Sequence, residues 1–453
     1  MNFHIKKMGQ NKSKSKNANP NYLCKVVQLK GLKKHPNADR LQMVTIDFNN
    51  VITGLDAKEG DTYVYFPIES KISRTFLSFT NSFRDKTFNE DPNQVGFFED
   101  NCRVKAMKLR GEKSMGYLVP MNQVYAWAFN EEVGSVFLGS DYTNQEFDTI
   151  NNLKLVEKYQ IPIKGGAQAR QGKKPKVSRL VEGQVHLHID TENLRKNAHK
   201  VRPTDLISIT YKTHGTSWWV ANVLVKRKLS LLERLLKKLG ILISDMEYDL
   251  VYGSRKVVKN AELQDPKAKD HFFGYDLWED IKNQVGEYIP KGWTLYGEML
   301  GFDKNGKAIQ AGFDYGCGTE CGSISHKLEV YRITNTTPDG LVTELSYPEI
   351  KNFCDKVGLQ CSHLFFYGHA GNWYNVDYTI PLEEWSTNFI KKLEEAFNEK
   401  DCFMCSNKVP EEGVVVRVED LFECKSYKLK SFRFLEFESK ELDKGVSDIE
   451  SEN

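Results

Sequence analysis

The sequence lacks the features that would assign it to a membrane, to secretion or to a disulfide-rich scaffold. No apolar run approaches the ~18 residues of a membrane-spanning helix, and the N-terminus lacks the apolar core of a secretory signal. The nine cysteines are odd in number and follow no framework spacing. We therefore expect an intracellular protein in a reducing compartment such as the cytoplasm, with no membrane partner.

Net charge is nearly absent as well, because 63 lysines and arginines stand against 61 aspartates and glutamates. The distribution is more informative: residues 1–19 contain five lysines and residues 161–179 contain six basic side chains, and neither stretch contains an acid. Such patches fit a polyanionic partner, and solvated tails explain them equally well. We expect a disordered basic leader (1–21), a basic linker (156–180) and an acidic tail (439–453).

The chain is long enough for two or three domains with sizeable cores, since 40% of its 453 residues are hydrophobic. Residues 22 to about 125 have the apolar–polar alternation of short strands, separated by Gly, Asn and Asp turns. HPNADRLQMVTID (35–47) and KLRGEKSMGYLVP (108–120) resemble stretches of OB-fold domains of the tRNA-binding type. This resemblance implies an OB-fold β-barrel, which we place at residues 22–155.

Residues 181–438 mix strands with three helical patterns. SLLERLLKKLG has leucines at helical spacing and ends on Gly240, while SYPEIKNFCDKVG offers Ser346 as N-cap and Gly358 as its end. The third pattern, PLEEWSTNFIKKLEEAF, places four large apolar side chains on one stripe, namely Trp385, Phe389, Leu393 and Phe397. We expect all three helices to cover a core.

The stretch YKTHGTS (211–217) places a lysine in a turn between two strand-like runs, DLISIT and WWVANVLV. A surface lysine is the ordinary explanation of such a pattern. Downstream, however, four further strand-like segments each present a charged or aromatic residue: YGEMLG (296–301), LEVYRI (328–333), EEGVVVR (411–417) and YKLKS (427–431). The order of the five segments is therefore more informative than any one of them.

Together these segments resemble motifs I, III, IIIa, IV and V of the covalent nucleotidyltransferase superfamily, which contains RNA ligases, DNA ligases and mRNA capping enzymes. KTHG is more similar to the RNA ligases, and an OB domain ahead of the catalytic domain is similar to one branch of the ATP-dependent RNA ligases. The two resemblances cover most of residues 22–435. They imply an α+β chain in which the OB-fold barrel precedes a nucleotidyltransferase domain of antiparallel sheets with covering helices (181–438).

The resemblance makes Lys212 the nucleophile that attacks the α-phosphorus of ATP, forms lysyl-AMP and releases pyrophosphate. Only a neutral amine is nucleophilic, and neutralising a lysine near pH 7 costs roughly 4–5 kcal/mol. Burial, a bound cation and the neighbouring Lys428 and Lys430 would each disfavour the ammonium form. Because the two lysines are two residues apart in a strand, their side chains share one face, where we expect them to act as catalytic contacts of the α-phosphate.

The same resemblance assigns the remaining nucleotide contacts. Glu412 would hold Mg²⁺ or Mn²⁺ through water, although the neighbouring Glu411 is an alternative for that place. Glu298 would bind the ribose and is a second candidate for the metal. Tyr331 would stack on the adenine, with ordinary core packing as its alternative. Arg255 would contact the ribose or the acceptor phosphate.

Three further positions belong to the predicted site. Gly215 would let the backbone approach the nucleotide closely. His214 stands where many relatives have aspartate, and a plain structural hydrogen bond is its alternative role. Tyr211 stands where many relatives have an acid that contacts the base, which weakens the preference for ATP over GTP. Arg195 is our candidate for contact with the pyrophosphate leaving group.

Two pairs of cysteines raise the question of a zinc site. Cys402 and Cys405 form a CxxC, but Cys317 and Cys321 have the looser CxxxC spacing and lie about 80 residues away. We favour free buried thiols over a zinc site.

The sequence thus predicts an ATP-dependent RNA ligase that joins a 3′-hydroxyl to a 5′-phosphate through lysyl-AMP and adenylylated nucleic acid. We expect a monomer whose partner is RNA, including an RNA/DNA hybrid or a nicked duplex. An mRNA guanylyltransferase that forms lysyl-GMP is the alternative within the superfamily. A nucleic-acid-binding module on a catalytically dead scaffold is the alternative from another class.

Overall fold

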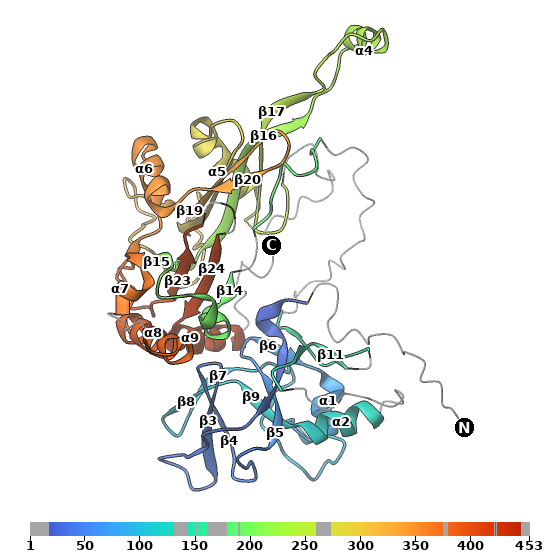
Figure 1. Cartoon of the computed structure of the whole chain (residues 1–453), viewed down its shortest axis with the longest axis vertical. Coiled ribbons are helices and arrows are strands. Elements are labelled where there is room, and N and C mark those ends of the chain that lie inside the picture. Colours follow the sequence, from blue (N-terminus) through green and yellow to red (C-terminus); the bar gives the residue numbers. More distant parts are fainter. Residues whose placement is uncertain are drawn as a thin grey trace, which may run out of the picture. The chain divides into compact units, whose positions relative to one another are not determined.

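The computed structural model describes residues 18–130, 143–150, 152–160, 179–188, 191–259, 273–374, 379–420, 422 and 424–444. The chain divides into two compact units, Met1–Gln160 and Ile161–Asn453 (Figure 1). The predicted leader, most of the predicted linker and the end of the predicted acidic tail lie outside the described residues. Within those ranges, no helix combines the length and the apolar composition that crossing a bilayer requires.

In its described residues, the N-terminal unit is built from short antiparallel strands and two α-helices. Its largest sheet has the order β10-β1-β5-β9, a second has the order β2-β3-β4, and three strand pairs complete the unit. The strands are β1 (Cys24–Gln28), β2 (Lys33–Lys34), β3 (Leu41–Ile46), β4 (Asn49–Gly54), β5 (Thr62–Phe66), β6 (Ser70–Ile72), β7 (Ala106–Leu109), β8 (Glu112–Met115), β9 (Tyr117–Pro120), β10 (Glu146–Phe147), β11 (Thr149–Ile150), β12 (Leu153–Lys154) and β13 (Val156–Lys158). The helices are α1 (Arg74–Phe79) and α2 (Met121–Asn130), with short 3-10 turns at Pro20–Tyr22 and Lys86–Phe88.

Two apolar clusters form the core of this unit. One lies between β1, β5 and the two helices and includes Phe66, Phe76 and Trp127, while the other lies under β3, β4 and β5. β13 pairs with β6, so the unit continues past the expected boundary at residue 155. Among the described strands no pairing closes a barrel, and the structure therefore shows a mixed α+β chain with several antiparallel sheets.

The C-terminal unit contains two larger sheets, which we name by the residues that they carry into the site. The lysine sheet has the order β14-β24-β23-β15-β22, and only its β14–β24 pair is parallel. Its strands are β14 (Glu192–Asn193), β15 (Leu206–Tyr211), β22 (Leu364–His369), β23 (Gly413–Val418) and β24 (Lys425–Lys430).

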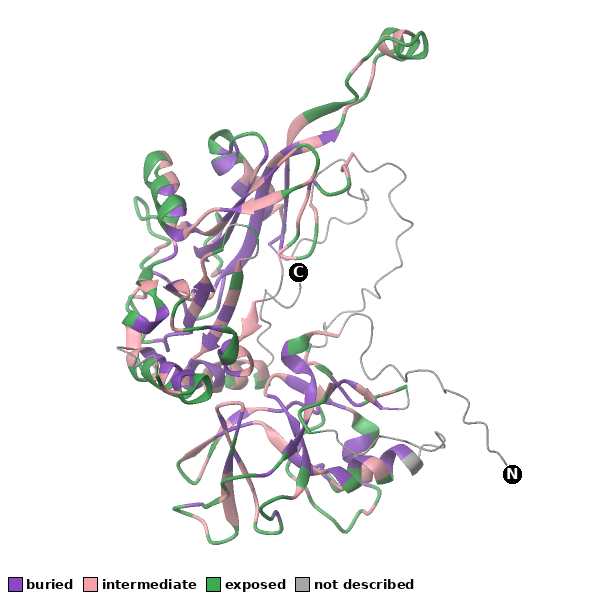
Figure 2. Cartoon of the chain, viewed as in Figure 1, coloured by how far each residue is buried: buried purple, intermediate pink, exposed green. Residues whose placement is uncertain are grey.

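The glutamate sheet has the order β17-β16-β18-β19-β20, with the short β21 added in parallel to β19. Its strands are β16 (Thr216–Lys226), β17 (Met246–Gly253), β18 (Trp293–Gly301), β19 (His326–Thr336), β20 (Val342–Glu344) and β21 (Gln360–Cys361). β18 is buried along nearly its whole length, as expected for a central strand, and Figure 2 shows the buried centre of this sheet in purple.

The described part of the C-terminal unit also contains seven α-helices. They are α3 (Leu194–Asn197), α4 (Leu231–Lys238), α5 (Leu277–Val285), α6 (Tyr347–Val357), α7 (Ala370–Tyr374), α8 (Leu382–Phe397) and α9 (Phe432–Asp443), with 3-10 turns at Ala198–Lys200 and Gly286–Tyr288. α6 begins at Ser346 with a capping box and ends at Gly358 in the left-handed conformation, as predicted. The predicted apolar stripe of α8 is fully buried, which confirms that α8 covers a core.

The prediction for the first leucine-rich helix is half right. Residues 231–238 form α4 with a capping box at Ser230, and Gly240 follows it at φ +85°. However, α4 stands at the far end of a long hairpin made by β16 and β17, and none of its residues is buried (Figures 1 and 2). The expectation that α4 covers a core is therefore wrong, because no element packs against its leucines among the described residues.

Candidate active site

Lys212 is the first residue after β15, as the sequence predicts for a lysine at a strand end. Its backbone N–H donates to the carbonyl of Gly413 at 2.9 Å, which continues the pairing of β15 with β23. Its Nζ lies 2.7 Å from Glu412 Oε1, and the two side chains are 18% and 2% exposed. The candidate nucleophile is thus held at the end of β15 by a buried carboxylate.

Two glycines bring the surrounding backbone together at Lys212. Gly413 has φ +144°, and a Cβ there would lie 2.1 Å from the carbonyl oxygen of Leu429. Gly215 lies against β18, where a Cβ would come within 2.3 Å of the Met299 carbonyl oxygen and 2.8 Å of Glu298 Cγ. Neither position accepts a side chain without movement, so close approach of the backbone explains both glycines.

A row of polar side chains crosses the glutamate sheet beside this loop. Ser217 pairs with Glu298, and Glu298 pairs in turn with Glu329, so all three side chains project from the same face. Ser217 Oγ donates to Glu298 Oε2 at 3.1 Å. Two carboxylates that stand directly opposite each other on neighbouring strands repel when both are charged. The row therefore favours a ligand that supplies donors or positive charge.

Glu329 belongs to this site although the sequence analysis did not single it out. It is buried, and its Oε1 accepts from Thr213 Oγ1 at 3.0 Å and from Ser362 Oγ at 2.9 Å. Burial raises the pKa of Glu329 to about 7, against the opposing effect of these hydroxyls. Because Thr213 is adjacent to Lys212, Glu329 ties the lysine loop to the glutamate sheet. The sequence did contain a signal for Glu329, because it is an acidic residue inside the largely apolar strand segment LEVYRI.

Glu411 and Glu412 are equally buried, yet their environments differ. Glu412 pairs with Lys212, while neither carboxylate oxygen of Glu411 has a hydrogen-bond partner within the described part of the chain. Burial, together with the nearby Cys402 and Glu412, raises the pKa of Glu411 to about 9. Glu411 is therefore uncharged near pH 7, and only Glu412 offers an anion to a metal or to an amine.

The two lysines of β24 project from one face, opposite to the buried Tyr427 and Leu429. Lys430 pairs with Gly413, whose carbonyl accepts the N–H of Lys212, so the three residues lie in a row across β24, β23 and the end of β15. Lys430 Nζ lies 3.2 Å from both carboxylate oxygens of Glu438 on α9. Lys428 lies two residues earlier, opposite Val415.

His214 and Tyr331 each pack against other aromatic side chains. The backbone N–H of His214 donates to Tyr315 Oη at 2.6 Å, and its ring packs edge-on against Phe313 and Phe434. Tyr331 is the extra residue at a β-bulge, since Tyr296 pairs with Arg332 and Gly297 pairs with Val330. Its hydroxyl is 3.3 Å from His188 Nδ1, and the two rings meet edge to face.

The two predicted arginines lie in different surroundings. Arg255 lies two residues after the end of β17. Since β17 is antiparallel to β16 and Gly253 pairs with Trp219, Arg255 lies near Ser217, at the N-terminal end of β16. Arg195 lies in α3 with its side chain buried, and its guanidinium forms an ion pair with Glu394 of α8. Contact of Arg195 with a leaving group would require this pair to open.

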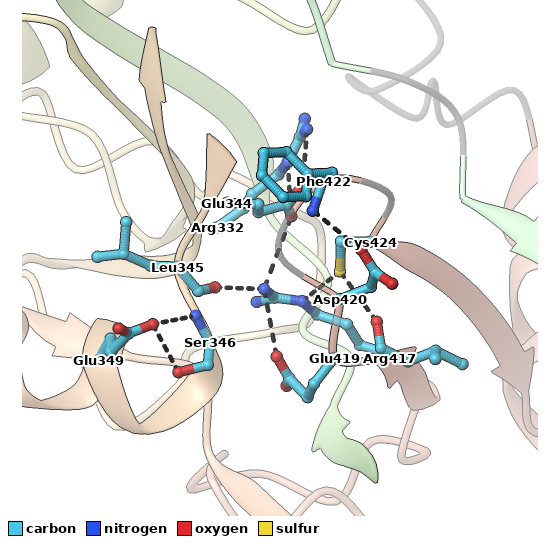
Figure 3. A network of polar contacts seen from close by, with 11 residues as sticks. Arg332, Glu344, Leu345, Ser346, Glu349, Arg417, Glu419, Asp420, Phe422 and Cys424 are labelled. Carbon is cyan, nitrogen blue, oxygen red and sulfur yellow. Dashed lines mark hydrogen bonds and ion pairs between the residues drawn. The ribbon is translucent and has the colours of Figure 1, made fainter. Parts of the chain in front are cut away.

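Arg417 on β23 connects the two sheets (Figure 3). Its guanidinium lies 3.4 Å from Glu419 and 3.8 Å from Glu344 on β20, and it also donates to the Leu345 carbonyl and to Cys424 Sγ. Glu344 in turn receives two hydrogen bonds from Arg332 on β19. This buried network holds the lysine sheet against the glutamate sheet.

The cysteine pairs do not gather into a metal site. All nine cysteines are free thiols, and no group of three or more His, Cys, Asp or Glu in the described ranges is arranged to hold a metal ion. Cys402 and Cys405 are neighbours whose hydrogen bond raises the pKa of Cys402 and lowers that of Cys405.

The comparisons with known proteins bear on the fold. No protein-family model and no curated protein matches the sequence. Among solved structures, a variant of the RNA ligase of Naegleria gruberi with ATP and manganese matches with a TM-score of 0.53 at 15% identity, over 92% of this chain and 98% of that one. The chain has the fold of an RNA ligase.

Further structures of the Naegleria ligase agree with this result. The form with pyrophosphate has a TM-score of 0.53 at 15% identity and covers 92% of this chain and 99% of that chain. A variant with AMP and manganese has a TM-score of 0.52 at 15% identity and covers 92% of this chain and 98% of that chain. The likeness to the RNA ligase fold therefore includes both units of this chain.

Proposed function

We propose that this protein is an ATP-dependent RNA ligase that works through a covalent lysyl-AMP at Lys212. The observation that carries the proposal is the lysine at the end of β15, held at 2.7 Å by the buried Glu412 and tied through Thr213 to Glu329. The match to the Naegleria RNA ligase, which was solved with ATP, AMP and pyrophosphate, supports the same chemistry.

The proposed reaction has three steps. Lys212 Nζ, after losing a proton, attacks the α-phosphorus of ATP; the N–P bond forms and pyrophosphate leaves with the broken P–O bond. A 5′-phosphate oxygen of the RNA then displaces the lysine and takes up AMP. Finally a 3′-hydroxyl attacks the activated 5′-phosphorus, which forms the phosphodiester and releases AMP.

Glu412 has a double role in this scheme. Its contact with Lys212 favours the protonated amine, and therefore differs from our expectation of a site that disfavours the ammonium form. When Glu412 leaves the ammonium for another partner, Lys212 can lose its proton to solvent more readily, and the neutral amine is then nucleophilic. Glu412 Oε2 is buried without a hydrogen-bond partner in the described structure, so this carboxylate can accept one more ligand.

The residues present fit a divalent cation bound mostly through water. Since no set of three protein ligands converges in the described ranges, Glu412, with Glu298 as a second candidate, would hold Mg²⁺ or Mn²⁺ together with phosphate oxygens of the substrate. Such a cation neutralises charge that develops on the phosphate. Glu298 would accept from the ribose hydroxyls, Tyr331 would stack on the base, and Lys428 and Lys430 would contact the α-phosphate.

The N-terminal unit is the proposed RNA-binding part. Its short antiparallel strands over residues 24–120 support an OB-fold, a class of small β domain that binds oligonucleotides. We propose a monomer that acts on RNA ends, including those of a nicked duplex or an RNA/DNA hybrid. His214, Gly215, Arg255 and Arg195 remain candidate contacts of the nucleotide or of the acceptor.

The direct test is covalent labelling. The protein is incubated with α-labelled ATP and Mg²⁺ or Mn²⁺ and separated by denaturing electrophoresis. We expect label on the parent, none on Lys212→Ala, and parent-like label on Lys351→Ala, whose lysine lies exposed on α6. A nicked duplex with an RNA 3′-hydroxyl and a 5′-phosphate then tests strand joining.

The alternatives give different results in the same assay. Label from GTP but not from ATP would replace the ligase by a guanylyltransferase. No label from either nucleotide, with RNA binding intact in both parent and Lys212→Ala, would favour a binding module. Label from ATP without joined product on any nick or end would contradict the ligase proposal.

A further inference from the structure

The tip of the β16–β17 hairpin, residues 226–246, exposes an unusual amount of apolar surface. Leu231 is 83% exposed, Leu239 is 70% exposed and Leu242 is fully exposed at 102%. Leu232, Leu235 and Ile241 are exposed as well. Scattered single leucines are ordinary on a protein surface, but a contiguous group of this size marks an interaction site.

The leucines are held outward by a well-defined helix. Ser230 and Glu233 form a capping box at the start of α4, and the pairs Arg227–Glu233 and Lys237–Asp245 tie the helix to the hairpin stem. At 100° per residue, the leucines of residues 231–239 occupy an arc of about 140°. The charged side chains of α4 occupy the rest of the helix. The apolar face is therefore a built feature of this hairpin.

The hairpin tip is also strongly basic. Residues 226–245 contain six lysines and arginines and two acids. Both acids are engaged in the pairs named above. Within the described structure this leaves Lys226, Lys228, Arg234 and Lys238 exposed without an acidic partner. The occupant of this surface must therefore be both apolar and anionic.

Three kinds of occupant meet these demands poorly. A second copy of the tip would bring like charges together. RNA would neutralise the cations but would leave the leucines in water. A stable protein interface buries ~800 Å² on each side, whereas a helix of eight residues is only ~12 Å long.

An anionic lipid surface satisfies both demands. Leucines enter the boundary between headgroups and acyl chains, basic side chains stay among anionic headgroups, and no matching protein surface is needed. We propose that the hairpin tip docks this protein reversibly on membranes that contain anionic lipids. The expectation of no membrane partner came from the length of apolar runs, which detects spanning helices and not a surface helix.

The test is flotation of the full-length protein with vesicles of phosphatidylcholine alone or with 30% phosphatidylserine added. We expect binding to the anionic vesicles, at least tenfold weaker binding to neutral ones, and weakening by salt. The triple variant Leu231→Gln, Leu235→Gln, Leu239→Gln should lose at least tenfold. The matched control Ile324→Gln, Leu341→Gln removes exposed apolar side chains elsewhere and should bind like the parent.

A charge variant separates the two contributions. Lys228→Ser, Arg234→Ser, Lys238→Ser should lose the preference for anionic vesicles, while labelling with ATP stays at the parental level in both tip variants. Failure of the parent to float with anionic vesicles would overturn the proposal, as would a leucine variant that floats normally. Loss of self-association in the leucine variant, or loss of RNA binding alone in the charge variant, would assign the tip to a second copy or to RNA.

Discussion

The two sheets of the C-terminal unit bring different electrostatics to one site. On the lysine sheet the charged groups are compensated, since Lys212 pairs with Glu412 and Lys430 pairs with Glu438. On the glutamate sheet two carboxylates, Glu298 and Glu329, stand opposite each other and accept hydrogen bonds from hydroxyl groups. In the proposed mechanism the first sheet would store the reactive amine in a neutral pair, and the second would present acceptors to the sugar and to a cation.

The largest effect is expected where the compensated pair is broken. Glu412→Gln removes the anion that holds Lys212 and that is proposed to accept a hydrated metal. We expect the rate of lysyl-AMP formation to fall by ~10²–10³. The rate of labelling by α-labelled ATP, measured at saturating nucleotide and metal, checks this.

Glu411→Gln is the matched control for that change. Glu411 is as buried as Glu412, but its pKa of about 9 leaves it uncharged near pH 7, so an amide replaces a carboxyl of similar shape. We expect labelling within about 0.5 kcal/mol of the parent, or a factor of about 2. A loss in Glu411→Gln as large as in Glu412→Gln would show that the two positions have been assigned in the wrong order.

The second prediction tests the buried contact between the two sheets. Arg417→Met leaves the buried Glu419 without its guanidinium and removes the link to Glu344 (Figure 3). We expect a loss of ~3–5 kcal/mol in the free energy of unfolding, as is usual for breaking a buried pair. Urea unfolding measures it. Arg433→Met, which breaks the exposed pair with Asp401, should cost ~1 kcal/mol or less.

Comparison of α4 with α8 shows how far the sequence alone could lead. Both helices were predicted from leucine or aromatic residues at helical spacing, and both exist. Trp385 and Phe389 of α8 are fully buried, whereas Leu231 of α4 is 83% exposed. Periodicity reports which side chains share a helix face, but what covers that face depends on elements distant in the chain.

The site shows the same limit. The place of Lys212 at a strand end followed from local pattern, as did the shared face of Lys428 and Lys430. The acidic partners of these lysines could not be predicted in the same way, because Glu412 and Glu438 reach Lys212 and Lys430 only in the folded structure. Regular alternation puts Glu329 and Tyr331 on one face, and Tyr331 does pack against the cluster that contains Trp219 and Tyr296 there; the β-bulge at which Tyr331 is the extra residue could not be predicted.

The third prediction uses the pH dependence of Glu329. Its pKa is raised from 4.5 to about 7 in the folded protein. The folded state therefore holds this proton more tightly than the unfolded state, and the stability that it contributes is present below pH ~4.5 and lost as the pH rises to ~7. The loss amounts to about 3 kcal/mol.

Glu329→Gln should remove this part of the pH dependence. Urea unfolding in metal-free buffer at pH 5 and pH 8 should show that the parent loses about 2–3 kcal/mol more than the variant, slightly less than the full effect because pH 5 lies above the unfolded pKa. Other acids with raised pKa values, such as Glu411, contribute equally to both proteins and cancel in the difference. Equal losses in parent and variant would mean that Glu329 is already charged at pH 5.

The smallest effect is expected at the neighbouring carboxylate. If Glu298 accepts from the ribose hydroxyls, Glu298→Gln should raise the KM for ATP about tenfold, because a charged acceptor is replaced by a neutral one. The decisive measurement uses sugar analogues. The parent should adenylylate more slowly with 2′-deoxy-ATP or 3′-deoxy-ATP than with ATP, and the variant should discriminate much less against at least one of them. An unchanged preference in Glu298→Gln would assign ribose recognition to another residue and would leave the glutamate sheet with a role toward the metal alone.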